Sequence, residues 1–158
     1  MHERHDDPFT VSVRVATPAD VGALAALRAL SSGGGEPDFE PRMAAWLADE
    51  GDRRTTWLAT VDEAPAGMAS MLEYRRMPRP GRPDSRWGYV SNMFVHEDLR
   101  NRGIGSALLT TIIAAADERG YARLVLSPSA RSVPFYERAG FVVPDERAGD
   151  HRLLVRPS

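Results

Sequence analysis

The chain has 158 residues, a formal net charge of −2, and neither cysteine nor lysine. These features exclude disulfides, thiolate catalysis, zinc–thiolate sites and a lysine general base, and they give no electrostatic reason to expect a nucleic-acid partner. No stretch approaches the roughly 20 apolar residues that a membrane span needs, so we expect a single cytoplasmic domain over 1–158, with no membrane or nucleic-acid partner.

The polar N-terminal segment, residues 1–7, carries His2 and His5. Two histidines in a charged terminal segment suggest a metal site, but a solvated, disordered tail is the simpler interpretation. The segment also lacks the apolar centre of a signal peptide. We therefore expect no metal site.

The first half of the chain predicts one strand, two helices and a hairpin. Thr17, Pro18 and Asp20 form a helix start, because threonine caps, proline suits the first turn and an acidic group three residues on completes a capping box. The glycine run that follows Ser32 ends this helix. The elements expected here are strand Phe9–Val15, a helix from Thr17 to Ser31, helix Pro41–Asp49, and strands Thr55–Val61 and Ala66–Tyr74 joined by a turn over residues 62–65.

The second half begins with an arginine- and proline-rich segment, Arg75–Arg86, that cannot be helical. It could contact an acidic substrate or polyanion, but we favour a solvated linker. The elements expected after it are strand Trp87–Val95, a helix from Ile104 to Arg119, strand Arg123–Ser127, helix Arg131–Ala139, a strand starting at Phe141–Val143, and strand His151–Val155. This order suits a mixed sheet with helices on both faces.

The most informative motif lies between the strand that ends at Val95 and the helix that starts at Ile104. It reads Arg-Asn-Arg-Gly-Ile-Gly over residues 100–105. A strand that passes through glycines into a helix aims several unpaired backbone N–H groups at one point, where a phosphate can bind. A P-loop is excluded because it needs a lysine, and the dinucleotide fingerprint is excluded because Leu108 stands at its third glycine position.

The pattern R-x-x-G-x-G resembles the acetyl-CoA pyrophosphate loop of GNAT-type N-acetyltransferases. A second block, Ser129–Phe141, resembles that superfamily's N-x-x-A-x-x-[FL]-Y-x-x-x-G-F, with Ser129 in place of asparagine and Ser132 in place of alanine. The resemblance covers about residues 85–143. It implies an α/β fold, with a central mixed, mostly antiparallel sheet of six to seven strands and about four flanking helices.

The resemblance also implies acetyl-CoA as co-substrate, without a metal. Backbone groups of a bulged strand would hold the thioester carbonyl and the pantetheine arm, although their side chains could simply be core residues. Tyr136 would be the general acid for the leaving thiolate, with a packed aromatic residue as the alternative. The loop between the first two helices would line the acceptor site. The implied cofactor-binding residues are Met93, Phe94, Val95, Arg100, Asn101, Arg102, Gly103, Ile104, Gly105, Ser106, Ser129 and Ser132.

The general base stays open. Some members of the superfamily carry a glutamate on the fourth strand, and the corresponding residue here is Tyr89, a poor base at neutral pH. Glu73, His96 and His151 are the remaining side-chain candidates, and a chain of water molecules is another.

We expect an N-acetyltransferase that moves an acetyl group by direct transfer from acetyl-CoA to a primary amine on a metabolite, an antibiotic or a protein N-terminus. The alternative is a non-catalytic acyl-CoA sensor with the same fold. A nucleic-acid binder acting through Arg75–Arg86 lacks aromatic stacking partners inside that segment. The resemblance allows a monomer or a homodimer.

Overall fold

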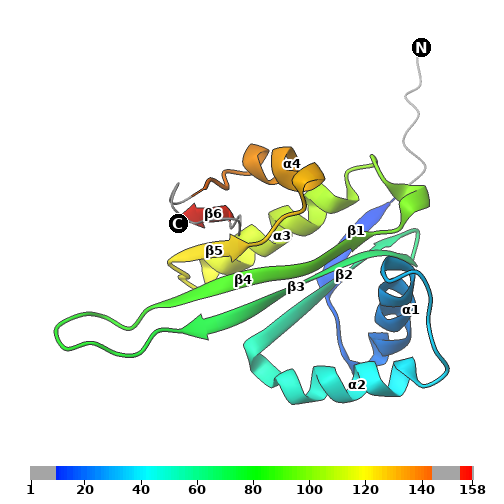
Figure 1. Cartoon of the computed structure of the whole chain (residues 1–158), viewed down its shortest axis with the longest axis horizontal. Coiled ribbons are helices and arrows are strands. Elements are labelled where there is room, and N and C mark those ends of the chain that lie inside the picture. Colours follow the sequence, from blue (N-terminus) through cyan, green and yellow to red (C-terminus); the bar gives the residue numbers. More distant parts are fainter. Residues whose placement is uncertain (1–9, 144–153, 158) are drawn as a thin grey trace, which may run out of the picture. The chain divides into compact units, whose positions relative to one another are not determined.

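The computed structural model describes residues 10–143 and 154–157 of the chain, so the predictions for residues 1–7 and His151 lie outside the described residues. Six strands form one mixed, mostly antiparallel sheet in chain order, and four helices accompany it, which confirms the expected fold class (Figure 1). The elements are β1 (Val11–Val15), α1 (Val21–Ser31), α2 (Phe39–Glu50), β2 (Arg54–Val61), β3 (Ala64–Arg75), β4 (Arg86–Val95), α3 (Ile104–Glu118), β5 (Arg123–Leu126), α4 (Val133–Arg138) and β6 (Leu154–Pro157).

The described residues form two compact units. The first comes from Met1–Ser70 and Asn92–Thr110, and the second from Met71–Ser91 and Thr111–Ser158. Strands β3 and β4 and helix α3 each contribute to both units, so no linker separates them. A single domain over 1–158 stays a prediction. None of the helices in the described chain is long and apolar enough to cross a membrane.

In the first unit, β1 pairs antiparallel with β2, from Val11 opposite Val61 to Val15 opposite Trp57. The hairpin between β2 and β3 turns on two residues, Asp62 and Glu63, with φ values of 51° and 71°. A two-residue turn with positive φ at both positions matches the right-handed twist of the strands that it joins. The turn is therefore two residues shorter than the predicted one, because β3 already begins at Ala64.

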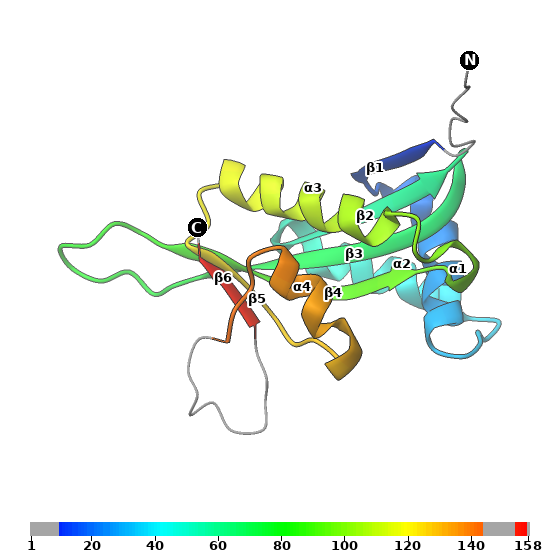
Figure 2. The same ribbon diagram turned by 90° about the horizontal axis from the view of Figure 1, so that it is seen from above.

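Adjacent residues of β3 face opposite sides of the sheet. Met68 packs on the side of α1 and α2, in a core with Leu24, Leu27 and Leu58. Gly67 faces the first turns of α3, and a Cβ there would lie 2.9 Å from the carbonyl oxygen of Phe94. Helices therefore cover both faces of this part of the sheet, as the period-two alternation of a strand requires (Figure 2).

The predicted start of the first helix is confirmed. A short 3-10 turn, Pro18–Asp20, precedes α1, and the Asp20 side chain accepts hydrogen bonds from the Thr17 backbone (2.8 Å) and from the Arg14 guanidinium (2.7 and 2.8 Å). These bonds, the one from Arg14 first, hold the pKa of the Asp20 carboxyl well below its usual range. The chain thus turns into α1 at a carboxylate that is fixed in its ionised form.

In the second unit, β4 pairs in parallel with β5 at Gly88–Leu124 and Tyr89–Val125, and β5 pairs antiparallel with β6. Of the strand predicted to start at Phe141–Val143, the described residues contain one pairing, an isolated bridge from Val142 to Val155 with two hydrogen bonds of 2.8 Å. The predicted helix over Arg131–Ala139 is a 3-10 turn, Ala130–Ser132, followed by α4, because Pro134 offers no N–H at the start of the helix.

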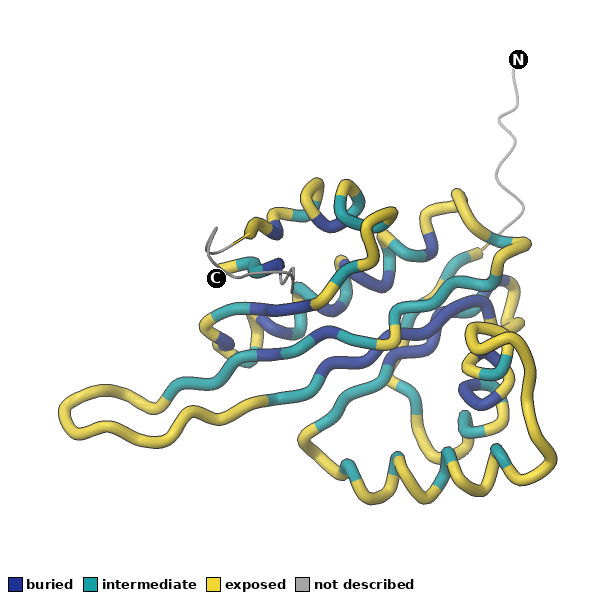
Figure 3. The backbone as a smooth tube through the Cα atoms, viewed as in Figure 1, coloured by how far each residue is buried: buried dark blue, intermediate teal, exposed yellow. Residues whose placement is uncertain are grey.

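The segment between β3 and β4 is exposed from Arg76 to Asp84 (Figure 3). The Arg76 N–H donates to the Ser85 carbonyl at 2.9 Å and closes its base. On the strand side of this hydrogen bond, Tyr74 of β3 stacks on Trp87 of β4, with ring centroids 4.5 Å apart. This is the geometry of a solvated hairpin extension, and it suits the linker interpretation.

A nearly buried carboxylate, Glu73, organises the second unit. The Tyr121 hydroxyl donates to it at 2.6 Å, Arg75 at 2.7 Å and Arg86 at 3.4 Å. The Tyr121 bond, followed by the arginines, lowers the pKa of Glu73 despite its burial. Arg86 also donates to the Arg119 carbonyl at 2.6 Å, at the end of α3. Glu73 is therefore a structural anion.

We expect Tyr121→Phe to lower the free energy of unfolding at pH 7 by about 1.5–3 kcal/mol, the usual value of a hydrogen bond to a charged group. A depressed pKa stabilises the fold above the unfolded pKa of about 4.3 and ceases to do so as the pH falls through the folded pKa. The difference between variant and wild type, measured by urea unfolding, should thus shrink below about pH 4. Tyr74→Phe, at an exposed tyrosine, is the control. A pH-independent difference would contradict the charged bond.

Candidate functional site

Strand β4 is one continuous strand, but a left-handed residue near its end, in the first unit, interrupts its regular backbone conformation. Asn92 has a φ of 56°, a left-handed conformation that is uncommon for any residue other than glycine. Inside an antiparallel strand this conformation marks a bulge, where the ladder is locally broken and backbone groups are re-aimed. It lies directly before Met93, Phe94 and Val95, the residues whose backbone is predicted to hold the thioester. The Phe94 side chain packs against the core, so its side chain is structural.

A buried hydroxyl holds this interruption. Ser70 is 2% exposed, and its Oγ accepts hydrogen bonds from Asn92 Nδ2 at 3.3 Å and from an Arg54 guanidinium nitrogen at 2.9 Å. Arg54 also donates to Glu50 at 2.5 Å and lies 4.7 Å above the Trp46 ring. The sequence offers no local signal for this network, because its members come from α2, β2, β3 and β4.

The predicted phosphate loop has the geometry of an anion site. Asn101 and Gly103 have φ values of 65° and 82°, and α3 begins at the next residue, Ile104. Residues 100–103 are exposed, and a Cβ on Gly103 would meet no atom within 4 Å. Left-handed residues next to a helix start turn successive N–H groups into one concavity. Ile104 is buried and anchors the loop, while Gly105 and Ser106 lie in the first helical turn, whose N–H groups have no intrahelical partner.

Two side chains brace the entry to this loop. Arg100 Nε donates to the Val95 carbonyl at 3.3 Å, which ties the loop to the end of β4. His96 Nδ1 accepts from the Asp98 N–H at 3.2 Å and caps a 3-10 turn, Glu97–Leu99. His96 was a candidate base, and the structure gives it a capping role. Arg102 is exposed.

The residues of the second sequence block lie in the second unit. Ser129 Oγ and Ser132 Oγ are 3.0 Å apart, and Ser132 Oγ donates to the Ser129 carbonyl at 3.0 Å. The two serines therefore bond each other at the turn that leads into α4. Cofactor contacts from them stay a prediction.

Tyr136 is 7% exposed and packs edge-to-face on Phe135 and Phe141, with centroid distances of 5.0 and 5.7 Å. Within the described chain its hydroxyl has no hydrogen-bond partner. Burial raises the pKa of the phenol, so it is protonated at neutral pH. The ring is thus a packed aromatic, as the alternative interpretation had it, and its hydroxyl is at the same time unused by the fold.

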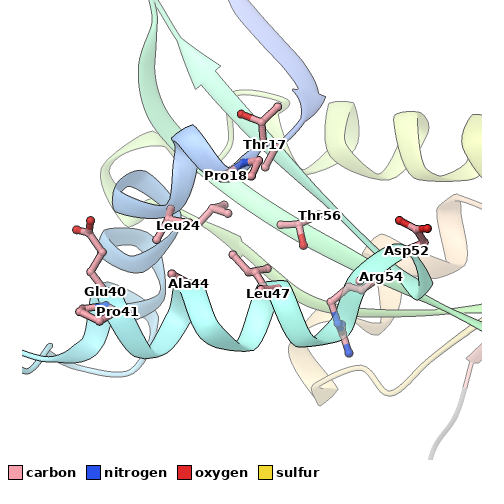
Figure 4. Close-up of a pocket in the computed structure, with 14 residues that line it drawn as sticks. Thr17, Pro18, Leu24, Glu40, Pro41, Ala44, Leu47, Asp52, Arg54 and Thr56 are labelled. Atoms are coloured by element: carbon pink, nitrogen blue, oxygen red, sulfur yellow. The ribbon is translucent and has the colours of Figure 1, made fainter.

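The first unit contains an aliphatic cavity of about 660 Å³ that sequence reasoning missed (Figure 4). Apolar side chains of α1 and α2, such as Leu24, Ala44 and Leu47, line its middle. Glu40 and Asp52 are its two carboxylates, and they lie toward opposite ends of α2. No residue of β3 or β4 lines this aliphatic cavity.

A second hollow of about 340 Å³, the arginine cavity, lies in the same unit. Its lining residues are Arg28, Phe39, Arg42, Met43, Trp46, Met68 and Asn92. A neighbouring recess of about 330 Å³ shares Arg28, Phe39 and Arg42 and is bounded by the loop between α1 and α2. The predicted acceptor loop therefore borders the recess, which shares three residues with the arginine cavity. Asn92, which directly precedes the predicted thioester strand, is part of its wall.

No side chain in the arginine cavity can act as a base. Its seven lining residues include no carboxylate and no imidazole. The Glu73 carboxylate accepts hydrogen bonds from Tyr121 and two arginines. Tyr89 of β4 is the pairing partner of Val125 on β5. Among the described residues, no three histidine, aspartate or glutamate side chains gather closely enough to hold a metal ion.

Two of the curated proteins that this chain resembles are named N-acetyltransferases. A glucosamine 6-phosphate N-acetyltransferase of Trypanosoma brucei brucei is 31% identical over 75 residues, which are 48% of this chain and 49% of that protein. The chain thus spans about half the length of this relative. An uncharacterized N-acetyltransferase of Escherichia coli K12, YafP, is 25% identical over 140 residues, covering 83% of this chain and 81% of that protein.

Solved structures share the fold. An acetyltransferase of Trypanosoma brucei superposes with a TM-score of 0.73 at 21% identity, covering 87% of this chain and 96% of that chain. A predicted acetyltransferase of Clostridium acetobutylicum, solved with acetyl-CoA, gives 0.70 at 24% identity, covering 87% and 93%. Residues 23–141 match the acetyltransferase (GNAT) family. The sequence blocks, the fold and this match agree: the chain belongs to the GNAT acetyltransferase family, whose co-substrate is acetyl-CoA.

Proposed function

We propose that this protein transfers an acetyl group directly from acetyl-CoA to the primary amine of a small acceptor. The observation that carries the proposal is the order of features in the first unit: the interruption of β4 at Asn92, then the phosphate loop, then the start of α3. Backbone N–H groups at Met93–Val95 would polarise the acetyl carbonyl, and a preorganised donor of this kind contributes more to the transition state than to the ground state.

We assign the other predicted site residues the following roles in cofactor binding and proton transfer. The pyrophosphate would bind the N–H groups of Gly103, Ile104, Gly105 and Ser106, with Asn101, Arg100 and Arg102 at the rim. Ser129 and Ser132 would contact the cofactor from the turn before α4, and Tyr136 would donate its proton to the departing thiolate. The raised pKa of Tyr136 supports this role only in keeping the phenol protonated, and a well-placed acid contributes roughly 10²–10⁴-fold.

The amine must lose a proton before it attacks. The arginine cavity is lined by two guanidinium groups and no base. Nearby positive charge disfavours an ammonium group, so a bound amine would lose its proton to water more readily than in solution. We propose that no side chain of the cavity is the general base. The cytoplasmic location and the choice between monomer and homodimer rest on the sequence alone.

The sensor alternative would need only the cofactor site. An enzyme also needs an acceptor site and a proton donor, and the arginine cavity and the unbonded hydroxyl of Tyr136 supply candidates for both. This favours the transferase. Release of free CoA thiol in the presence of a panel of primary amines tests it, and tight acetyl-CoA binding without acetylation of any of them would favour the sensor.

We expect Gly103→Ala to weaken CoA binding at least tenfold, because the methyl group would occupy the open side of the loop. Gly120→Ala is the matched control: Gly120 has a φ of 71°, also with no atom within 4 Å of a Cβ. Each variant should lose about 1–2 kcal/mol of stability from a left-handed alanine. Calorimetry should show weakened CoA only for Gly103→Ala. Equal CoA affinity in both folded variants would contradict the loop assignment.

Tyr136→Phe should fold like the wild type, because it removes one oxygen and keeps both ring contacts. Its kcat should fall by roughly tenfold to a thousandfold, while CoA affinity holds, since the hydroxyl acts as charge builds on sulfur. Phe135→Leu, which disturbs packing next to it, is the comparison for a merely structural effect: it should lower Tm more than Tyr136→Phe does. Wild-type kcat in a folded Tyr136→Phe protein would remove this residue from the mechanism.

The pH dependence of kcat/KM tests the proposal that no side chain of the cavity acts as the general base. We expect log kcat/KM to rise with pH with unit slope and to level at the pKa of the acceptor's own amine. Acceptors with amines of different pKa should therefore move the bend. A bend at one pH for every acceptor would show that a protein group takes the proton.

A further inference from the structure

We propose that the arginine cavity selects an acceptor that carries an anionic group, a phosphate or a carboxylate, in addition to its amine. The inference rests on the proposed acetyl transfer, because it names the class of acceptor for that reaction. It comes from the charges, the wall and the position of one hollow in the first unit.

The cavity carries an excess of positive charge. Arg28 and Arg42 both line it and both line the neighbouring recess. Arg42 forms an ion pair with Glu36. No carboxylate lies within ion-pair distance of the Arg28 guanidinium anywhere in the described chain. Arg28 stands in the last turn of α1, where a cation is favoured by the helix dipole, but that position alone does not explain a second arginine on the same two hollows.

Guanidinium groups suit phosphate and carboxylate above other ligands. Their planar donors match two oxygens at once, and the resulting bonds are roughly twice as strong as neutral ones. An anion at Arg28 could also compete with Glu36 for Arg42. We therefore place the anionic group of the acceptor on the side of the cavity formed by Arg28 and Arg42.

The rest of the cavity lining suits a small, partly apolar molecule. The apolar lining residues are Phe39, Met43, Trp46 and Met68. The guanidinium of Arg54 lies over the Trp46 ring and holds that side chain in place. A volume of about 340 Å³ lies at the small end of ligand pockets, which run from about 300 to 1,000 Å³. This favours a metabolite over a peptide chain.

The orientation of the bound acceptor in the arginine cavity follows from the position of Asn92. It is the cavity residue adjacent to Met93–Val95, where the thioester is proposed to lie. The amine would therefore point to Asn92. The larger aliphatic cavity is a poor site for the same molecule, because its lining carries two carboxylates, Glu40 and Asp52, against one arginine, Arg54, that already bonds Glu50. No β4 residue lines it.

Matched pairs of amines test the inference. Glucosamine with glucosamine 6-phosphate tests phosphate, and an amino acid with its amide tests carboxylate. We expect the wild type to prefer the anionic member of at least one pair by tenfold or more in kcat/KM. Arg28→Gln and Arg42→Gln should reduce that preference by roughly tenfold to a hundredfold each. Arg53→Gln, at an exposed arginine that lines neither cavity, should keep the preference of the wild type.

A binding readout separates this inference from the proposed function. The same amines, titrated without acetyl-CoA, should change the tryptophan fluorescence, with the anionic member binding more tightly. Trp46→Phe should abolish the change, while Trp57 and Trp87 remain. Anion-selective binding without any acetylation would support the inference and overturn the transferase. Acetylation with equal kcat/KM for both members of each pair would overturn the inference and leave the transferase standing.

Discussion

The candidate site depends on one buried hydroxyl. Ser70 accepts hydrogen bonds from Asn92 on β4 and from Arg54 on β2, and Arg54 in turn binds Glu50 and Trp46 of α2. A left-handed asparagine inside a strand costs free energy and persists only where its surroundings determine it. Here the surroundings are a satisfied polar network, which is worth most where water is excluded. The break in β4 and the wall of the arginine cavity are thus consequences of the same contacts.

These contacts connect two features of the first unit, the left-handed Asn92 and the arginine cavity. The residue that breaks β4 also lines the arginine cavity, and the strand beyond it leads through His96 and Arg100 into the phosphate loop. The residues for which we propose thioester polarisation, pyrophosphate binding and acceptor placement therefore belong to the segment from Asn92 to Ser106 and to α1, α2 and β3. Glu73, which lies outside this segment, is bonded by Tyr121 and two arginines and has a structural role.

The second unit contains a nearly buried charge that its hydrogen bonds keep ionised. Glu73 is an ionised carboxylate that is nearly buried, and it stays ionised because a phenol and two arginines bond it. A fully bonded anion is a poor proton acceptor, so its position on a central strand does not make it catalytic. Tyr136 is the reverse case: its ring is packed, yet its hydroxyl has no hydrogen-bond partner among the described residues.

The sequence by itself determined the order of elements, the capped start of α1 and the family, and it predicts the phosphate loop, because each is encoded by neighbours along the chain. Gly103 directly before Ile104, or Thr17 three residues before Asp20, is a local signal. Tertiary structure alone decided that Asn92 is left-handed, that Glu73 bonds Tyr121, and that Arg28 and Arg42 share a cavity with Trp46. Those outcomes depend on which side chains meet from distant strands and helices. The physical reason is that burial and hydrogen-bond satisfaction are properties of the packed chain, which no short run of residues contains.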